Sequence, residues 1–225
     1  MIDPVIIGKA TLYNMDCLEY MATLPDKAFE LAICDPPYGI GENAFRSASR
    51  SKAAKTTDWG AFDKHWDKAS PGADYFLELQ RVSQNQIIWG ANHMMGVIGK
   101  SSPCWIVWDK DNSGCFADCE LAYTSFRTAV RMVKFRWNGM IQGDMVNKEM
   151  RIHPTQKPVK LYEWLLTHYA KRGDRILDTH LGSMSSVIAA NNLGFELTGC
   201  ELDPDYFKAG CTRAMQATAQ QRMFP

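Results

Sequence analysis

The sequence predicts an α/β protein built on a doubly wound, mostly parallel sheet. Short apolar segments alternate along the chain with segments of helical periodicity, which is the pattern of repeated strand–helix units. Two apolar segments, Phe29–Cys34 and Arg175–Leu177, are each followed at once by an aspartate and a turn or loop. An acidic residue where a strand passes into a loop is typical of nucleotide-binding βαβ units.

The individual elements follow from local patterns. Phe29–Cys34 is predicted as a buried strand because Asp35-Pro36-Pro37 ends its apolar run. The other predicted strands are Gln86–Trp89, Trp105–Trp108, Leu121–Phe126, Arg175–Leu177 and Leu197–Cys200. Helices are predicted from about Ser185 to Asn192, and from Pro158, a residue favoured at the first helical position, towards the stop at Gly173.

A length of 225 residues predicts one domain. The segment 41–70 has no sustained periodicity, and it predicts a long mobile loop whose position directly after Tyr38 favours a function over a tolerated insertion. The region 127–151 is the other candidate for a small subdomain.

Composition narrows the class of protein. With 25 basic and 25 acidic residues the net charge is zero, which argues against a general polyanion binder, so any nucleic-acid contact must come from local patches. No apolar run approaches the ~20 residues of a membrane span and no secretion signal is recognisable at the start, so we expect a cytoplasmic protein. The seven cysteines are scattered, and Cys115 and Cys119 lack a second ligand pair, so reduced thiols and no metal are expected.

The tetrapeptide Asp35-Pro36-Pro37-Tyr38 has the groups needed to activate an amino group on a nucleic-acid base. The lone pair of such an amino group is delocalised into the ring, and acceptors facing its two N–H groups make the pair available. The Asp35 carboxylate and the Pro36 carbonyl could accept these protons while the prolines hold them rigid. A base must leave the helix stack to be reached, and Tyr38 offers a ring on which it could stack. The alternative is a simple turn after a strand.

The second strand–loop–helix unit predicts a cofactor site. Asp178 and Gly182-Ser183 precede a helix, and Glu201 ends the next strand about 20 residues further on, where an acidic residue accepts hydrogen bonds from ribose hydroxyls. The alternative for Glu201 is a solvated acid before a turn.

Together these residues resemble the β class of DNA amino-methyltransferases, in which the catalytic motif precedes the cofactor loop. Further segments that resemble this family are Asn14-Met15-Asp16-Cys17, His153-Pro154-Thr155-Gln156-Lys157-Pro158 and Gly199-Cys200-Glu201-Leu202-Asp203. Trp89-Gly90-Ala91-Asn92-His93 and Val107-Trp108-Asp109-Lys110 are most similar to small phage or prophage adenine methylases.

The resemblance implies a Rossmann-like fold of the S-adenosylmethionine-dependent methyltransferase type and an enzyme of bacterial or phage-infected cells, such as those of restriction-modification systems. The implied catalytic residues are Asp35, Pro36, Pro37 and Tyr38. The implied cofactor-binding residues are Asp16, Cys17, His153, Thr155, Gln156, Lys157, Asp178, Gly182, Ser183, Glu201 and Asp203. Thr155 and Lys157 could instead cap the following helix.

One departure bears on cofactor binding. Members of the family usually carry a second glycine in the loop, whereas this chain has Met184 in the stretch Asp178-Thr179-His180-Leu181-Gly182-Ser183-Met184. If the position needs a positive φ or close backbone approach, methionine there weakens cofactor binding or requires a shifted loop.

An aspartate in the first position of the tetrapeptide is typical of adenine-N6 enzymes, so adenine is the expected target and cytosine N4 the alternative. DNA is the expected partner, with a homodimer as a further possibility. The expected DNA-contacting residues are basic, namely Arg46, Arg50, Lys52, Lys55, Arg127, Arg131, Lys134 and Arg136. Region 127–151 is short for target recognition, so relaxed specificity is an option. A DNA-binding protein without turnover, and methylation of RNA or protein, are rival hypotheses.

Overall fold

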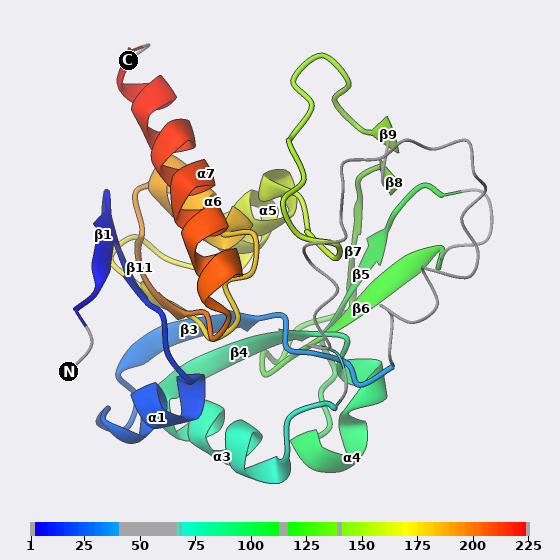
Figure 1. Ribbon diagram of the computed structural model, residues 1–225. Helices are drawn as coiled ribbons and strands as arrows, with labels where there is room; N and C mark the ends of the chain where they lie inside the picture. Colours follow the sequence, from blue (N-terminus) through cyan, green and yellow to red (C-terminus); the bar gives the residue numbers. More distant parts are fainter. Residues whose placement is uncertain (1–2, 41–66, 68, 113–116, 139–140, 224–225) are drawn as a thin grey trace.

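A nine-stranded sheet forms the centre of the computed structural model, which describes residues 3–40, 67, 69–112, 117–138 and 141–223 (Figure 1). The strand order is β1-β2-β11-β10-β3-β4-β6-β5-β7. These strands are β1 (Val5–Ile7), β2 (Ala10–Tyr13), β3 (Phe29–Cys34), β4 (Ser83–Trp89), β5 (Trp105–Asp109), β6 (Cys119–Thr124), β7 (Arg131–Lys134), β10 (Arg175–Asp178) and β11 (Glu196–Cys200). Strands β8 (Trp137–Asn138) and β9 (Ile141–Gln142) form a separate antiparallel pair.

The sheet is mostly parallel, as the sequence predicts. Parallel pairing joins β2 to β11, β11 to β10, β10 to β3, β3 to β4, and β5 to β7. The β1–β2, β4–β6 and β6–β5 pairs are antiparallel. The strands predicted from apolar runs are all present, and β3 has the predicted bounds.

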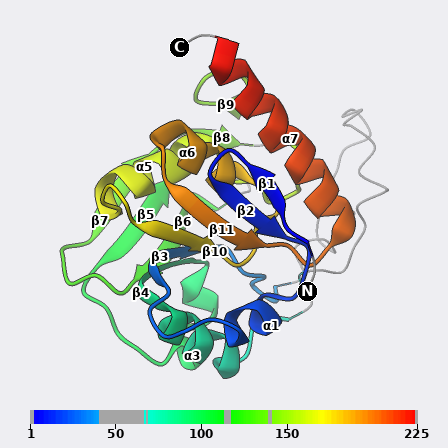
Figure 2. The ribbon, with the colours of Figure 1, turned by 90° about the vertical axis from the view of Figure 1, so that its left-hand side faces the viewer.

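Helices cover both faces of the sheet (Figure 2). One face carries α5 (Val159–Tyr169), α6 (Ser185–Leu193) and α7 (Pro204–Met223), and the other carries α1 (Cys17–Ala22), α3 (Ala73–Val82) and α4 (Met95–Ile98), which follows the short 3₁₀ helix η2 (Ala91–His93). Along β3, Leu31 and Ile33 pack into the core under α5 and α6, while Ala32 and Cys34 pack into the core over α3. Burial of both faces explains why this strand reads as a continuous apolar run.

The connections of the sheet place a topological switch point between β10 and β3. From β10 the chain crosses through α6 to β11 on one side, and from β3 it crosses through α3 to β4 on the other. Open α/β sheets bind ligands at the carboxyl ends of the strands beside such a point. Asp178, the last residue of β10, and Asp35, the residue after β3, therefore flank the expected ligand crevice.

No helix among the described residues is both long and apolar enough to cross a membrane.

Candidate active site

The tetrapeptide Asp35-Pro36-Pro37-Tyr38 leaves the carboxyl end of β3 as irregular chain. The Tyr38 hydroxyl donates a 2.8 Å hydrogen bond to Asp35 Oδ1, and the Tyr38 ring stacks on His93 with centroids 5.4 Å apart. Gly90, at the end of β4, has a φ of +64°, and a Cβ there would lie 2.1 Å from the Tyr38 ring. The absent side chain at Gly90 therefore leaves the space that the tyrosine ring occupies.

Gly39, which follows the motif, lies close to Asp67 and Ser70. The Gly39 N–H donates a 2.7 Å hydrogen bond to the buried Asp67 carboxylate. A Cβ on Gly39 would lie 2.7 Å from the Ser70 nitrogen, so the two ends of the segment are close together. Residues 41–66 and 68 of the predicted loop 41–70, and with them Arg46, Arg50, Lys52 and Lys55, lie outside the described residues.

Lys157, which the family pattern suggests as a cofactor residue, contacts the tetrapeptide Asp35-Pro36-Pro37-Tyr38. Its Nζ is 2.6 Å from Asp35 Oδ2 and 3.0 Å from the Tyr38 hydroxyl, to which it donates. The lysine backbone is fixed to α6, because its carbonyl accepts a 2.7 Å hydrogen bond from Ser185 Oγ. The side chain is only 3% exposed, so its charge is compensated within the protein.

Glu120 provides a second carboxylate for this ammonium group. It lies on β6, with Oε2 3.1 Å from Lys157 Nζ and Oε1 in an ion pair with Lys110. Sequence reasoning missed Glu120 because it stands just ahead of the apolar run 121–126. The available signal was a charged residue at the start of a predicted buried strand.

The pKa values in this cluster follow from burial and from the charges around each group. Burial raises the pKa of Asp35, with a further contribution from Glu120, and these outweigh the lowering effect of Lys157. Burial opposes ionisation of Glu120, but Lys157 and Lys110 outweigh it and lower its pKa to about 2. Burial also works against the Lys157 ammonium, yet Asp35 and Glu120 raise its pKa above the usual value. Asp35 is therefore the carboxyl group of this cluster that is easiest to protonate.

A second group of residues surrounds the loop between β10 and α6. The Gly182 N–H donates to Glu201 Oε2 at 2.8 Å, and the Asp203 N–H donates to Glu201 Oε1 at 3.0 Å. The buried Asp178 accepts from the His180 N–H at 3.0 Å and from the Ser186 hydroxyl at 2.5 Å, so it holds the loop together. Burial raises the pKa of Asp178 to about 7.

The segment 153–156 forms one wall beside this loop. The His153 ring packs on Tyr206 with centroids 4.3 Å apart, and a Cβ at Gly182 would meet that ring at 3.8 Å. Thr155 Oγ1 lies 3.2 Å from His153 Nδ1. The amide of Gln156 donates to the Met150 carbonyl and accepts from the Ile152 N–H. His153 thus faces the loop, whereas Gln156 stabilises the wall itself.

The chain after β2 closes the same region from the other side. Asp16 caps α1 by accepting from the Leu18 N–H at 2.7 Å, and burial raises the pKa of the Cys17 thiol to about 12. Asn14 Nδ2 donates to the Glu201 carbonyl at 2.7 Å. The structure thus brings the sequence-predicted cofactor residues together at one edge of the sheet, and Lys157 among them contacts Asp35.

These residues fit the cofactor expected from the sequence. Each oxygen of the Glu201 carboxylate accepts one backbone N–H, which leaves lone pairs for ribose hydroxyls. Gly182 has a φ of +46°, and a Cβ there would meet only the His153 ring within 4 Å, so the backbone is open to a bound group. Ser183 is 6% exposed, and its Oγ is 3.1 Å from Ser185 Oγ, so it contributes more to the start of α6 than to an open surface.

Met184 has the left-handed backbone that favours glycine, with a φ of +58°. Its side chain is fully buried, and a Cβ on Gly210 of α7 would lie 2.8 Å from Met184 Cγ. The position needs positive φ, as the family pattern suggested, and the methionine side chain packs against α7 away from the strand ends. Gly210 on the neighbouring helix leaves room for the methionine side chain.

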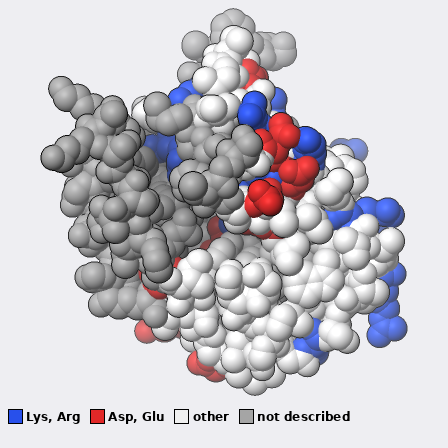
Figure 3. Space-filling model, turned by 90° about the vertical axis from the view of Figure 1, so that its right-hand side faces the viewer, with Lys and Arg blue, Asp and Glu red and all other residues white. Residues whose placement is uncertain are grey.

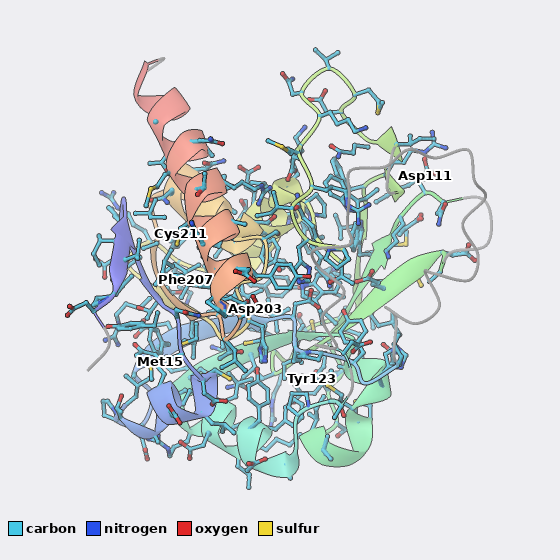
Figure 4. The ribbon with its side chains drawn as sticks, in the orientation of Figure 1. Met15, Asp111, Tyr123, Asp203, Phe207 and Cys211 are labelled. Atoms are coloured by element: carbon cyan, nitrogen blue, oxygen red, sulfur yellow. The ribbon has the colours of Figure 1, made fainter. Side chains whose placement is uncertain are left out.

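Among the basic residues expected on DNA, the structure describes Arg127, Arg131, Lys134 and Arg136, and these are spread over different parts of the sheet. Arg127 lines a cavity of about 490 Å³ with Lys27 and Lys100, at the edge of the sheet where β3 and β4 begin. Arg131 begins β7 and Lys134 ends it, so they lie at opposite edges of the sheet. Lys134 also forms an ion pair of 2.7 Å with Asp111, which Figure 4 shows far from Met15. Of these four residues, Lys134 and Arg136 lie towards the strand ends that carry Asp35.

The distribution of charged residues on the surface also shows the described basic residues dispersed (Figure 3). On the face shown in Figure 3, the described basic residues are mixed with acidic ones or lie at the margin, and no continuous basic band crosses the described part.

Comparison with known proteins shows similarity to DNA methylases. A family model described as DNA methylase, for the N6/N4 class, matches residues 107–211. The type II methyltransferase M2.DpnII of Streptococcus pneumoniae is 22% identical, over 89% of this chain and 88% of its own length. M1.MboII of Moraxella bovis is 23% identical, over 87% of this chain and 92% of its own.

These matches support a DNA methyltransferase of the N6/N4 family. Solved structures agree on the fold of this methylase. The cytosine-N4-specific PvuII DNA methyltransferase superimposes with a TM-score of 0.61 at 14% identity, covering 97% of this chain and 93% of its own. A complex of M1.HpyAVI with S-adenosylmethionine superimposes with a TM-score of 0.56 at 18% identity, covering 91% and 99%.

Proposed function

We propose that this DNA methylase transfers a methyl group from S-adenosylmethionine to the N6 amino group of adenine in DNA. DNA amino methylation is supported by the matches to this family, and the choice of adenine is the finer part of the proposal. The observation that carries the proposal is the position of Asp35 and Glu201 directly after β3 and β11, the two strands that flank β10, with the Gly182 loop that follows β10 donating to Glu201.

Asp35 and the Pro36 carbonyl would accept the two protons of the amino group and direct the nitrogen lone pair out of the ring plane. Tyr38, whose ring already stacks on His93, would hold the extruded base by its face. Asp35 must be ionised to accept, and Lys157 favours that state against the effect of burial. After transfer the nitrogen carries a positive charge, and the Asp35 carboxylate can take its proton.

Glu201 would hold the cofactor ribose, and the backbone at Gly182 and the His153 ring would lie beside its amino-acid part. When bound, S-adenosylmethionine supplies the electrophilic sulfonium methyl group. Asp16, Cys17, Thr155, Gln156, Asp178, Ser183 and Asp203 shape this site through the capping and loop contacts that they make.

Contacts with DNA would come from Lys134 and Arg136 on the side of Asp35, together with the basic residues 46–55, with action in the cytoplasm of a bacterial or phage-infected cell. Region 127–151, which contains β7, β8 and β9, would contribute to target recognition. It exposes the apolar side chains of Met132, Met145, Val146 and Met150, which suit contact with a base edge, a sugar or a second protein copy.

Cytosine N4 is the second candidate, because the two amino groups present the same pair of N–H donors to Asp35 and Pro36. A protein that binds DNA without turnover is a third. Incubation with tritiated S-adenosylmethionine and unmethylated plasmid DNA tests methyl transfer, with calorimetric binding of S-adenosylhomocysteine measured in parallel. Binding of S-adenosylhomocysteine with label in DNA supports the proposal, whereas absence of both favours the protein without turnover.

A further inference from the structure

Both oxygens of the Asp35 carboxylate are engaged in the base-free structure. Oδ1 accepts from the Tyr38 hydroxyl, and Oδ2 is 2.6 Å from the Lys157 ammonium. The ammonium group therefore holds the kind of position that an amino N–H donor of the target base must take. A base amino group can bind here only if Lys157 gives up part of this contact.

The charge of Lys157 also conflicts with the reaction. The attacking nitrogen gains positive charge as the methyl group arrives, and a fixed ammonium on the same carboxylate repels that charge. At the short distances of a site with few waters, such repulsion raises the barrier appreciably. The ammonium must move away from Asp35 before transfer.

Glu120 offers the place to which it can move. Its Oε2 is already 3.1 Å from Lys157 Nζ, and this oxygen makes no hydrogen bond of good geometry in the structure. A shift of the ammonium towards Glu120 would shorten that contact while releasing Asp35 Oδ2. Lys110 binds the other oxygen of Glu120 and fixes the carboxylate in place.

We propose that the Lys157 ammonium occupies the place of the target amino group on Asp35 when no base is present. When the base enters, the ammonium moves from Asp35 to Glu120 and the amino group takes its place. Lys157 and Glu120 are then positioning residues of the methyl-transfer reaction. This inference rests on the proposed function. The family pattern suggested a cofactor role for Lys157 and no role for Glu120.

The charged and titratable groups facing Asp35 come from every surrounding element. They are Tyr38 on the motif, Glu120 on β6, Lys110 after β5, Lys157 before α5, Tyr162 on α5 and Asp178 on β10.

The cluster of Asp35, Glu120, Lys157 and Lys110 has no net charge when all four are ionised. Removal of Glu120 or of Lys157 alone leaves one uncompensated charge, and removal of both restores the balance.

A double-mutant cycle tests the inference. Glu120→Gln leaves Lys157 without its second carboxylate, so methyl transfer to plasmid DNA should slow about tenfold or more, with S-adenosylhomocysteine affinity unchanged. Lys157→Met should move the acidic limb of kcat/KM to higher pH, because Asp35 loses the ammonium that keeps it ionised. The double variant Lys157→Met/Glu120→Gln should be faster than Glu120→Gln alone, because the competing ammonium is gone.

Matched controls are Lys160→Met, an exposed lysine in the first turn of α5, and Asp118→Asn, an exposed residue just before β6. Both should leave rate and pH profile unchanged. Thermal unfolding of each variant identifies those that fail to fold, and the charge balance predicts that the double variant unfolds at a higher temperature than Glu120→Gln.

A double variant that is no faster than Glu120→Gln would overturn the inference and leave the proposed function standing. Loss of S-adenosylhomocysteine affinity in Lys157→Met would overturn it in favour of the cofactor role suggested by the family pattern. A wild-type protein that transfers no methyl group to DNA would contradict the proposed function itself.

Discussion

Met184 packs its side chain into the space that Gly210 leaves on α7, while its own backbone has the positive φ of a glycine position. The two residues are therefore coupled across the start of α6. A glycine in the loop and a larger residue on α7 would be the reverse solution to the same packing problem.

Gly210→Ala should destabilise the protein by about 1–3 kcal/mol, because the new methyl group overlaps Met184 Cγ and crowds the Gly182 carbonyl. In a Met184→Gly background the same change should cost about 1 kcal/mol less, since the main overlap is gone. Urea unfolding of the four proteins measures the coupling. Strictly additive effects would show that the two side chains do not share this space.

Asp35→Ala should lower the rate of methyl transfer by about a hundredfold to a thousandfold, because the main acceptor for the amino protons is lost. Binding of S-adenosylhomocysteine should stay within about twofold, since Asp35 contacts none of the cofactor residues around Glu201. Asp26→Ala, an exposed change at the other edge of the sheet, is the control. Substantial activity in the Asp35 variant would refute its assigned role.

Tyr38→Ala should weaken capture of the base and raise the KM for DNA about tenfold or more, as expected for loss of one stacking ring. Tyr38→Phe keeps the ring beside His93 and loses only the hydroxyl that donates to Asp35. It should therefore retain most of the affinity. Equal losses in the two variants would indicate that the hydroxyl, and not the ring, is what matters.

Glu201→Gln should reduce affinity for S-adenosylhomocysteine about tenfold, because an amide has one acceptor oxygen where the carboxylate has two. The amide NH₂ would also face the N–H of Gly182 or Asp203. Calorimetry measures the loss, with the exposed Glu196→Gln at the other end of β11 as control. Unchanged affinity would place the ribose elsewhere.

Asp178 gives the stability of the fold a defined pH dependence. Burial raises its pKa from 3.8 to about 7, so the protonated form is favoured in the folded state. Its contribution to stability is fully present below pH 3.8 and is lost as the pH rises through about 7. Asp178→Asn should flatten the fall of the unfolding temperature between pH 5 and pH 8, by about several degrees at the upper end. An unchanged slope would show that another group causes it.

Helices and strands were predictable from the sequence where the apolar pattern and the residues that end it lie within the element itself. Strand β3 was predicted in full because both of its faces are buried and a proline pair ends it. Helix α7 was missed, because its buried positions include small residues, Gly210, Cys211 and Ala214, that give a weak apolar pattern. It packs on α6 and on β1, and β1 lies almost 200 residues away in sequence.

The site was predictable as two motifs but not as a set of contacts. Asp35 and Glu201 stand at strand ends, where parallel topology alone brings them to one edge. The contact of Lys157 with Asp35 was not predicted, because nothing in the segment 153–158 shows where a long side chain points. Glu120 depends on the antiparallel pairing of β4 with β6, a long-range contact that no local pattern records.

The central claim is tested most directly by the identity of the methylated nucleoside. Plasmid DNA incubated with the protein and S-adenosylmethionine is digested and analysed by mass spectrometry, beside the same reaction with Asp35→Ala. The account predicts N6-methyl-2′-deoxyadenosine from the wild type and none from the variant. N4-methyl-2′-deoxycytidine would contradict the choice of base, and no modified nucleoside from a protein that binds S-adenosylhomocysteine would contradict the enzyme itself.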